Sequence, residues 1–305
     1  METLVLAHYY TTPEVQALAD YVGDSLDLAQ KAVEHKPERI VFAGVRFMAE
    51  TAKILNPETE VILPDSGSTC SLVEQTDVEE LRKWRESFPE HVHVAYINSS
   101  AAHKALADII VTSRIVDDVI KSIYESGRHV IFSPDYNMGA YLNQTYGYEM
   151  PLWSAVCEVH DKFKLEELEK AMMGWTDGGK YVLAHPESPL PILEKADYVG
   201  STHGMLNWIR EFPHKVGTIW VATEDGLLYN MRNERPELDI RQAPIYSGCQ
   251  CNSCPYMKLN TEMNVLKAKA GIGTKIDYLT EAQMQLARKP IERMLEFQKT
   301  GKVNI

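Results

Sequence analysis

The sequence has little positive charge and lacks a long apolar run. It contains 31 lysine and arginine residues against 43 aspartate and glutamate residues, so its net charge at pH 7 is -12. So acidic a chain has no broad basic face for nucleic acid or anionic lipid, and any anion site must be local. No stretch approaches the roughly 18 to 20 apolar residues of a membrane-spanning helix, and Met1-Glu2-Thr3 is not a basic leader. We therefore expect a cytoplasmic protein that binds neither nucleic acid nor a membrane.

Cysteine is also scarce, with five residues in a chain of 305. Cys249, Cys251 and Cys254 crowd together, whereas Cys70 and Cys157 stand alone. In a chain that we expect to have no leader, this pattern of cysteines favours metal ligation or redox chemistry over a disulfide framework. The hydrophobic content of 45% is enough for two or three compact units, each with its own core.

The sequence contains one pattern three times. Asp20, Asp108 and Asp197 recur at nearly equal intervals, and each follows a short apolar run. A polar ring residue precedes each aspartate at one fixed distance in sequence: His8, Tyr96 and His185. A hydroxyl residue follows each aspartate at another fixed distance: Ser25, Ser113 and Thr202. Short apolar strands alternating with helices are typical of parallel βαβ units. We therefore predict an α/β fold of three similar αβα three-layer units with parallel sheets, arranged about a pseudo-threefold axis.

The repeat also predicts the domain boundaries. The first unit comprises residues 1–80 together with a C-terminal helical tail, 275–305, the second comprises 81–167 and the third 168–274. Apolar residues at near-helical spacing between Glu281 and Lys299 predict a tail that packs back on the first unit. Pro290 should kink or split that tail.

The cysteines near the end of each unit predict a metal site. Ligands gather at the carboxyl ends of parallel strands, and Cys70, Cys157 and Cys254 each follow such a strand. Three sulfurs are one short of a closed site, which favours a [4Fe-4S] cluster with one open iron that polarises a bound oxygen. The alternative is a zinc clip of Cys249, Cys251 and Cys254 with one other ligand, in which Cys70 and Cys157 are small buried residues.

Two further sets of side chains recur at the unit starts. The hydroxyls Ser25, Ser113 and Thr202, with Ser201, could be ordinary helix N-caps, or three helix N-termini could together hold phosphate or carboxylates. Strand-end polar residues could move protons near neutral pH or could be structural hydrogen-bonding groups. This second set comprises His8, Tyr10, Tyr96, Asn98, His185 and Glu187, with His160 after Cys157.

Taken together, these segments resemble the quinolinate synthases. The matching stretches span nearly the whole chain in the family's order. They include Leu6-Ala-His-Tyr-Tyr10, Gly44-Val-Arg-Phe-Met-Ala-Glu50, Tyr96-Ile-Asn-Ser99, Val156-Cys-Glu-Val-His160, His185-Pro-Glu187, Ala196-Asp-Tyr-Val-Gly-Ser-Thr202 and Cys254-Pro-Tyr-Met257.

The resemblance implies a reaction and a cofactor. It implies condensation of iminoaspartate with dihydroxyacetone phosphate to quinolinate, with release of phosphate and water, in the biosynthesis of NAD. It implies a [4Fe-4S] cluster held by Cys70, Cys157 and Cys254, the last chosen because Pro-Tyr-Met follows it. The resemblance is also compatible with a transient contact with the enzyme that supplies iminoaspartate.

The resemblance also assigns roles to residues. Glu187, Tyr10, Tyr96, His160 and His185 would transfer protons and orient substrate, with Glu187 as the base. The substrate carboxylates and phosphate would be held by His8, Ser25, Asn98, Ser113, Ser201 and Thr202.

Two other classes fit parts of the sequence. An iron-sulfur dehydratase of the aconitase kind would use an open iron but would not release phosphate. A non-enzymatic iron-sulfur or zinc sensor would need a closed site with four ligands.

Overall fold

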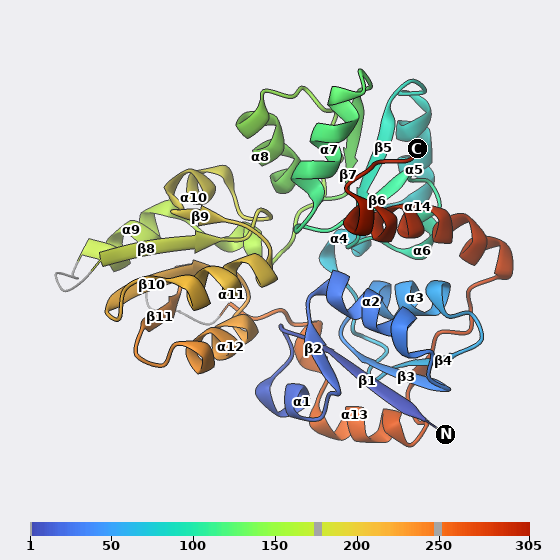
Figure 1. The fold of residues 1–305 in the computed structure, drawn as a ribbon, viewed down its shortest axis with the longest axis horizontal. Helices are drawn as coiled ribbons and strands as arrows, with labels where there is room; N and C mark the ends of the chain where they lie inside the picture. The colour runs from blue at the N-terminus through green and yellow to red at the C-terminus, as the bar shows by residue number, and fades with distance from the viewer. Residues whose placement is uncertain (1, 174–178, 247–251) are drawn as a thin grey trace.

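The computed structural model describes residues 2–173, 179–246 and 252–305 and contains three separate β-sheets flanked by helices (Figure 1). Every strand pairing in the described part of the chain is parallel except that of the short strand β12 with β4. The predicted α/β class with parallel sheets is confirmed. Whether the three units are related by a threefold axis stays a prediction.

The first sheet is built around a strand that is apolar on both faces. Leu4, Val5, Leu6 and Ala7 of β1 are all buried, as expected for a parallel strand covered by helices on either side. The strand order is β12-β4-β3-β1-β2. The elements are β1 (Thr3–His8), α1 (Pro13–Ala17), β2 (Tyr21–Gly23), α2 (Ser25–His35), β3 (Arg39–Ala43), α3 (Arg46–Leu55), β4 (Glu60–Leu63), α4 (Ser71–Glu74), α13 (Glu262–Lys269) and β12 (Thr274–Lys275).

The second sheet has the order β6-β5-β7, again with its first strand in the middle. Isolated bridges from Phe132 to Leu152 and from Asp135 to Ala155 continue the pairing beyond β7, so residues 152–155 run alongside that strand. The elements are α5 (Val78–Glu86), β5 (Val92–Tyr96), α6 (Ala101–Lys104), β6 (Ile109–Val111), α7 (Val116–Glu125), β7 (Val130–Ser133) and α8 (Tyr136–Tyr146).

The third sheet has the order β11-β10-β8-β9 and repeats the same arrangement of first, second and third strands. It is the sheet on the left of Figure 1. The elements are the 3₁₀ turn η1 (His160–Lys162), α9 (Leu165–Met173), β8 (Gly179–Ala184), α10 (Leu190–Lys195), β9 (Tyr198–Val199), α11 (Thr202–Glu211), β10 (Gly217–Ala222), α12 (Gly226–Glu234), β11 (Asp239–Gln242) and the 3₁₀ turn η2 (Met257–Leu259).

The repeated aspartate has a structural explanation. The side chain of Asp20 accepts a hydrogen bond of 2.7 Å from the backbone N–H of Val5, in the first strand of its unit. Asp108 accepts from the backbone N–H of His93 at 2.8 Å, and Asp197 accepts from that of Val182 at 2.7 Å. The same bond therefore joins the second strand to the first in all three units, which accounts for the recurring sequence offset.

The C-terminal segment ties the first and second sheets together. The helix α14 (Glu281–Thr300) runs through Pro290 as one helix and contacts α6 and β6 as well as α3. Ala287, Ile291 and Met294 of α14 belong to a buried apolar cluster shared by those two sheets. The tail therefore contacts elements of both the first and the second sheet.

Residues near the predicted boundary at 274 also join the first sheet. The strand β12 pairs with β4, and α13 contacts β3 and α1. The predicted third unit, 168–274, thus includes elements that pack on the first sheet, and its boundary stays a prediction. The division of the remaining chain at residues 80 and 167 stays a prediction.

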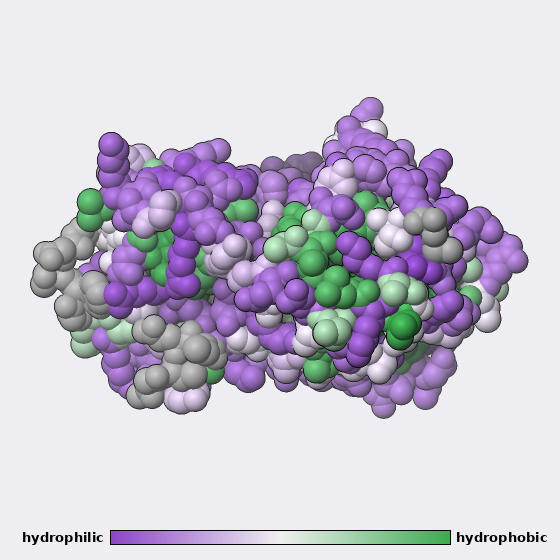
Figure 2. Space-filling model, turned by 90° about the horizontal axis from the view of Figure 1, so that it is seen from below, coloured by the Kyte–Doolittle hydropathy of each residue, from purple (hydrophilic) through white to green (hydrophobic). Residues whose placement is uncertain are grey.

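The surface is largely polar. Figure 2 shows small apolar patches among hydrophilic side chains on the face that lies at the bottom of Figure 1. Within the described residues, no helix has both the length and the apolar character needed to cross a membrane.

Candidate active site

One cavity is lined by strand ends and loops of all three sheets. It lies at the carboxyl ends of β1, β5 and β8, the edge where parallel sheets present their ligand-binding loops. The structure brings almost all the residues predicted from the sequence to this cavity: His8, Tyr10, Ser25, Cys70, Tyr96, Asn98, Ser113, Cys157, His160, His185, Glu187, Thr202 and Cys254. Ser201 is the one predicted site residue that is not part of the lining.

Three thiols enter the cavity from separate loops. Cys70 precedes α4, Cys157 precedes η1 and Cys254 precedes η2, and all three are free, partly buried cysteines. Burial raises the pKa of each thiol, that of Cys254 to about 12. The thiolate forms that bind metal therefore need a cation beside them. Cys249 and Cys251 lie outside the described residues.

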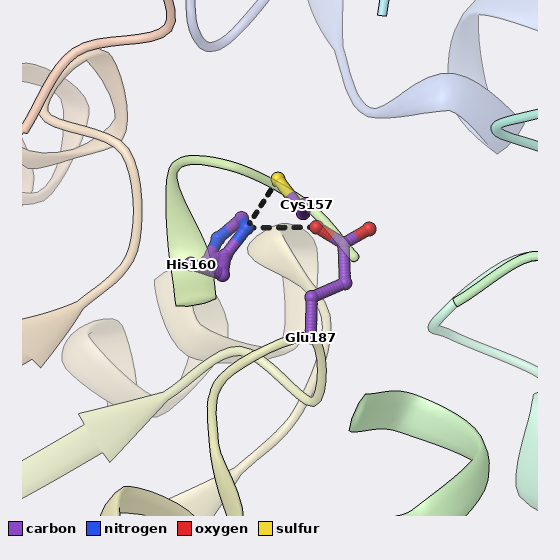
Figure 3. Close-up of side chains that lie close together, drawn as sticks. All are labelled: Cys157, His160 and Glu187. Atoms are coloured by element: carbon purple, nitrogen blue, oxygen red, sulfur yellow. Dashed lines mark hydrogen bonds and ion pairs between the residues drawn. The ribbon is translucent and has the colours of Figure 1, made fainter. Parts of the chain in front are cut away.

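Cys157 also belongs to a smaller group with metal-ligating atoms. Its sulfur and atoms of His160 and Glu187 all lie within 4.8 Å of one another, close enough to share one ion (Figure 3). Among the described residues, the sulfurs of Cys70, Cys157 and Cys254 do not form such a group. The three thiols are thus gathered around the cavity with spacing wider than a single ion requires.

Several polar side chains of the cavity lining lie around the carboxylate of Glu187. His160 Nδ1 is 2.7 Å from Glu187 Oε2, and Asn98 Nδ2 donates to Glu187 Oε1 at 3.1 Å. Tyr96 forms a further side-chain hydrogen bond with this carboxylate, and His185 Nδ1 lies 3.8 Å from it. Glu187 is only 2% exposed, so these neighbours replace water as its solvation.

The buried histidines and Glu187 have opposite charge preferences. Burial lowers the pKa values of His8 and His185 to about 3, so both rings are neutral near pH 7. Burial alone would raise the pKa of Glu187, but the imidazoles of His185 and His160 and hydrogen bonds from His160 and Tyr96 outweigh it and lower that pKa. Glu187 is therefore an ionised, buried proton acceptor.

A hydroxyl that the sequence analysis missed joins two predicted residues. Thr223 Oγ1 lies 2.9 Å from the hydroxyl of Tyr10 and 3.0 Å from His160 Nε2. Thr223 directly follows β10, so inspecting the third strand of each unit, and not only the first, would have found it. Gly226 nearby lets the first unit approach, since a Cβ there would lie 2.6 Å from the carbonyl oxygen of Tyr9.

The recurring hydroxyls are not the helix caps. The side chain of Asp24 caps α2 and that of Ser201 caps α11, so Ser25 and Thr202 occupy the first helical position instead. Ser113 lies in the turn before α7, and its hydroxyl is 3.2 Å from His185 Nε2. The capping alternative therefore applies to Ser201, whereas the other three hydroxyls line the cavity.

Two buried carboxyl groups hold the cysteine loops. Glu224 Oε1 accepts from the backbone N–H of Cys254 at 3.0 Å, and Asp135 accepts from the backbone N–H of Cys157. Each acid lies just beyond a third strand, β10 or β7. Asp135 and Glu224 follow the repeated aspartates Asp108 and Asp197 by the same number of positions, a recurrence that the sequence analysis did not use.

An α/β protein with three free thiols and a buried, hydrogen-bonded carboxylate around one cavity has the features of a metal-dependent enzyme. Comparison with known proteins identifies the family. Residues 1–296 match the quinolinate synthetase A protein family. The chain therefore belongs to the quinolinate synthase family of enzymes.

Individual members of the family are similar in sequence to this chain over almost its full length. The chain is similar to the quinolinate synthase of Microcystis aeruginosa, with 38% identity over 97% of this chain and 91% of the relative. It is 40% identical to that of Prochlorococcus marinus strain MIT 9303 over 97% of this chain and 87% of the relative. The quinolinate synthase of Gloeothece citriformis is also 40% identical, over 98% of this chain and 91% of the relative.

Proposed function

We propose that this enzyme condenses iminoaspartate with dihydroxyacetone phosphate to form quinolinate, releasing phosphate and water, in NAD biosynthesis. The observation that carries the proposal is the cavity itself, in which three thiols, a buried carboxylate and a set of hydroxyls from three sheets converge. Family membership supplies the reaction class. The cytoplasm, where the metabolites of such a pathway circulate, is the proposed location, and the enzyme that supplies iminoaspartate is the proposed transient partner.

Cys70, Cys157 and Cys254 are proposed to hold a [4Fe-4S] cluster. The fit is supported by the donor set, because three free thiols from three loops face one cavity and leave one iron without a cysteine. A single zinc ion would draw its sulfurs to about 2.3 Å from the metal, whereas the three thiols are not gathered as a one-ion group. When bound, the cluster supplies a Lewis-acidic iron for a substrate oxygen.

Glu187 is proposed as the base that removes a proton from bound substrate. Its carboxylate is ionised and is oriented from two sides by His160 and Asn98. A general base must be deprotonated and held within reach of its proton, and both conditions favour this residue. Tyr96 and His185, the other two neighbours of the carboxylate, would exchange protons with the substrate or orient it.

Tyr10 is proposed to act with His160 through the hydroxyl of Thr223. Tyr10 lies on the first sheet's loop and His160 on the loop after Cys157, so Thr223 links groups from separate parts of the chain. Burial raises the pKa of Tyr10 well above its usual value, which keeps the phenol protonated and able to donate.

The anionic groups of the substrates are proposed to lie among His8, Asn98 and the hydroxyls. Ser25 and Thr202 stand at the first positions of α2 and α11, where the helix dipole favours negative charge. Ser113 adds a third hydroxyl from the second unit. Ser201 would contribute indirectly, by fixing the start of α11.

A pseudo-threefold arrangement of the units is part of the same proposal. Each sheet has its first strand flanked by its second and third, and each unit contains the same aspartate hydrogen bond. Three similar units related by one axis would direct their equivalent strand ends toward a common point, where the cavity lies.

The deciding experiment is an anaerobic assay of protein with a reconstituted cluster, supplied with iminoaspartate and dihydroxyacetone phosphate. Quinolinate and phosphate should appear together, and protein without iron should form neither. Cluster-loaded protein that forms no quinolinate would refute the proposal. Loss of water from a hydroxy acid without phosphate release would favour a dehydratase, and a four-ligand cluster without turnover would favour a sensor.

A further inference from the structure

An arginine outside the predicted site joins the first and second units beside the cavity hydroxyls. Arg114 directly follows Ser113, and its guanidinium reaches two carboxylates of the first unit. Arg114 Nη2 lies 2.6 Å from Asp24 Oδ2 and 2.8 Å from Asp27 Oδ2, while Nη1 lies 2.9 Å from Asp27 Oδ1. The contact with Asp27 is bidentate, which is the geometry that arginine provides and lysine does not.

The third unit reaches the same carboxylate. His203 directly follows Thr202, and its Nδ1 lies 3.5 Å from Asp27 Oδ2. Residues next to Ser113 and Thr202 therefore both face Asp27, which lies two positions after Ser25. This cluster, Asp24, Asp27, Arg114 and His203, thus contains a sequence neighbour of each of the three hydroxyls that line the cavity.

The two carboxylates create an electrostatic difficulty for an anion site. Asp24 is 5% exposed and itself lines the cavity, and its burial raises the pKa of its carboxyl in spite of the charge of Arg114. Burial opposes ionisation of Asp27, but the hydrogen bond and charge of Arg114 outweigh it and lower the pKa of Asp27, so this group is ionised at neutral pH. Fixed negative charge beside the cavity repels phosphate and carboxylate groups. A cation must offset it before an anion can bind.

We propose that Arg114 is a positioning residue that offsets Asp24 and Asp27, so that the hydroxyl-lined part of the cavity can hold an anionic group of a substrate. It acts through the two carboxylates and touches no reacting atom. The identity of the substrates rests on the proposed function, whereas the charge balance rests on the contacts of Arg114 alone. The same contacts fix α2 of the first unit to the turn before α7 of the second, which sets the spacing of Ser25 and Ser113.

Charge compensation can be distinguished from a merely structural clamp. Replacement Arg114→Met leaves the carboxylates unpaired, and the second change Asp27→Asn then removes one negative charge without restoring the ion pair. If Arg114 only held the units together, the second change would restore nothing. If Arg114 offsets charge, the double variant should recover anion binding.

The experiment measures binding of inorganic phosphate and of succinate, a non-reacting dicarboxylate, to cluster-loaded protein by calorimetry. We expect Arg114→Met to weaken binding of at least one anion about tenfold or more, since the negative charge of the Asp24–Asp27 pair loses its partner. The double variant Arg114→Met/Asp27→Asn should recover most of that loss, and Arg114→Lys, which keeps the charge but not the bidentate contact, should bind the anions better than Arg114→Met. KM for the substrates should rise in Arg114→Met more than kcat falls.

Arg210→Met is the matched control. Arg210 pairs with Glu234 at 2.6 Å, but both side chains are exposed and neither lines the cavity. Its anion affinities should not change. Unfolding temperature and cluster absorbance confirm that each variant is folded and loaded.

Two results would overturn the inference: unchanged anion affinity in folded Arg114→Met, or a double variant that binds no better than Arg114→Met. If quinolinate never forms but anion binding follows the expected pattern, the proposed reaction fails and the role of Arg114 stands. If quinolinate forms and the anion pattern fails, only the role of Arg114 is lost.

Discussion

At the scale of single residues, four polar side chains surround the buried carboxylate of Glu187. His160, Asn98 and Tyr96 form hydrogen bonds with its carboxylate, and His185 lies nearby. A buried carboxylate is costly to ionise unless such donors surround it. The donors therefore keep this residue in the form that accepts a proton.

The first prediction concerns this carboxylate. Glu187→Gln preserves the shape of the side chain but removes the proton acceptor, so we expect turnover to fall about 10²- to 10⁴-fold. Visible absorbance of the cluster should remain, since Glu187 is not a proposed iron ligand. Glu237→Gln, at an exposed site paired with Arg235, is the control. Unchanged turnover in Glu187→Gln would remove Glu187 from the mechanism.

The second prediction concerns the hydroxyl shared by Tyr10 and His160. Thr223→Val keeps the volume but leaves both groups without this partner, which we expect to cost about 1 to 3 kcal/mol of unfolding free energy. Turnover should fall as well, because Tyr10 and His160 lose their common orientation.

The control is Thr218→Val on the same strand, β10. Thr218 is buried at the end of the strand away from the cavity, where its hydroxyl makes a long contact of 3.4 Å with Asp239. It should change stability without changing turnover per folded molecule. If both variants lose turnover equally, Thr223 has no special role.

Sequence reasoning found the first-strand residues of the site because they recur. His8, Tyr96 and His185 occupy one offset, and parallel strands place such positions at one edge. Thr223 and Arg114 were missed because no equivalent residue of the same chemistry stands in the other units. Ser201 was assigned to substrate because it adjoins Thr202, yet one-residue differences at a helix start decide which side chain caps the helix.

At the scale of elements, the approach of α12 to the first unit positions Tyr10. A Cβ on Gly226 would lie 2.6 Å from the carbonyl oxygen of Tyr9 and 2.9 Å from the Cα of Tyr10. Both are backbone atoms, which cannot move aside as the end of a flexible side chain can. The loop after β1 reaches the third unit only because residue 226 lacks a side chain.

The third prediction is that Gly226→Ala displaces that loop. Overpacking of this kind costs about 1 to 3 kcal/mol, and we expect a lower unfolding temperature together with reduced turnover. Gly217→Ala is the matched control, because its nearest neighbours would lie at an ordinary 3.5 Å. Full activity in Gly226→Ala would show that the position of Tyr10 does not matter.

Alternating strands and helices were readable from apolar runs, and the α/β class followed from them. The return of the chain to the first sheet was not readable. The strand β12 comprises only Thr274–Lys275 and pairs antiparallel, so it carries no periodic apolar signal. Likewise, Ala287, Ile291 and Met294 predict a buried helix face, but their spacing does not say which unit covers it.

At the scale of the whole molecule, the cavity depends on all three units at once. The fourth prediction is that Cys70→Ser, Cys157→Ser and Cys254→Ser each abolish cluster binding, because each removes one of three ligands. Iron and sulfide content and visible absorbance provide the measurement. Loss of the cluster should also lower the unfolding temperature, since a group that binds only the folded state stabilises it.

The remaining cysteines are the control. Cys249→Ser and Cys251→Ser should retain iron and sulfide. If these two variants instead lose bound metal while Cys70→Ser and Cys157→Ser keep it, the zinc clip considered from the sequence would replace the cluster.

The residues that line the cavity extend from His8 to Met257. A polypeptide emerging from the ribosome therefore has no complete pocket until most of its length has been synthesised, however early the first sheet folds. Insertion of the proposed cluster would therefore have to wait until nearly the whole chain has been synthesised, and prematurely terminated chains would not retain it.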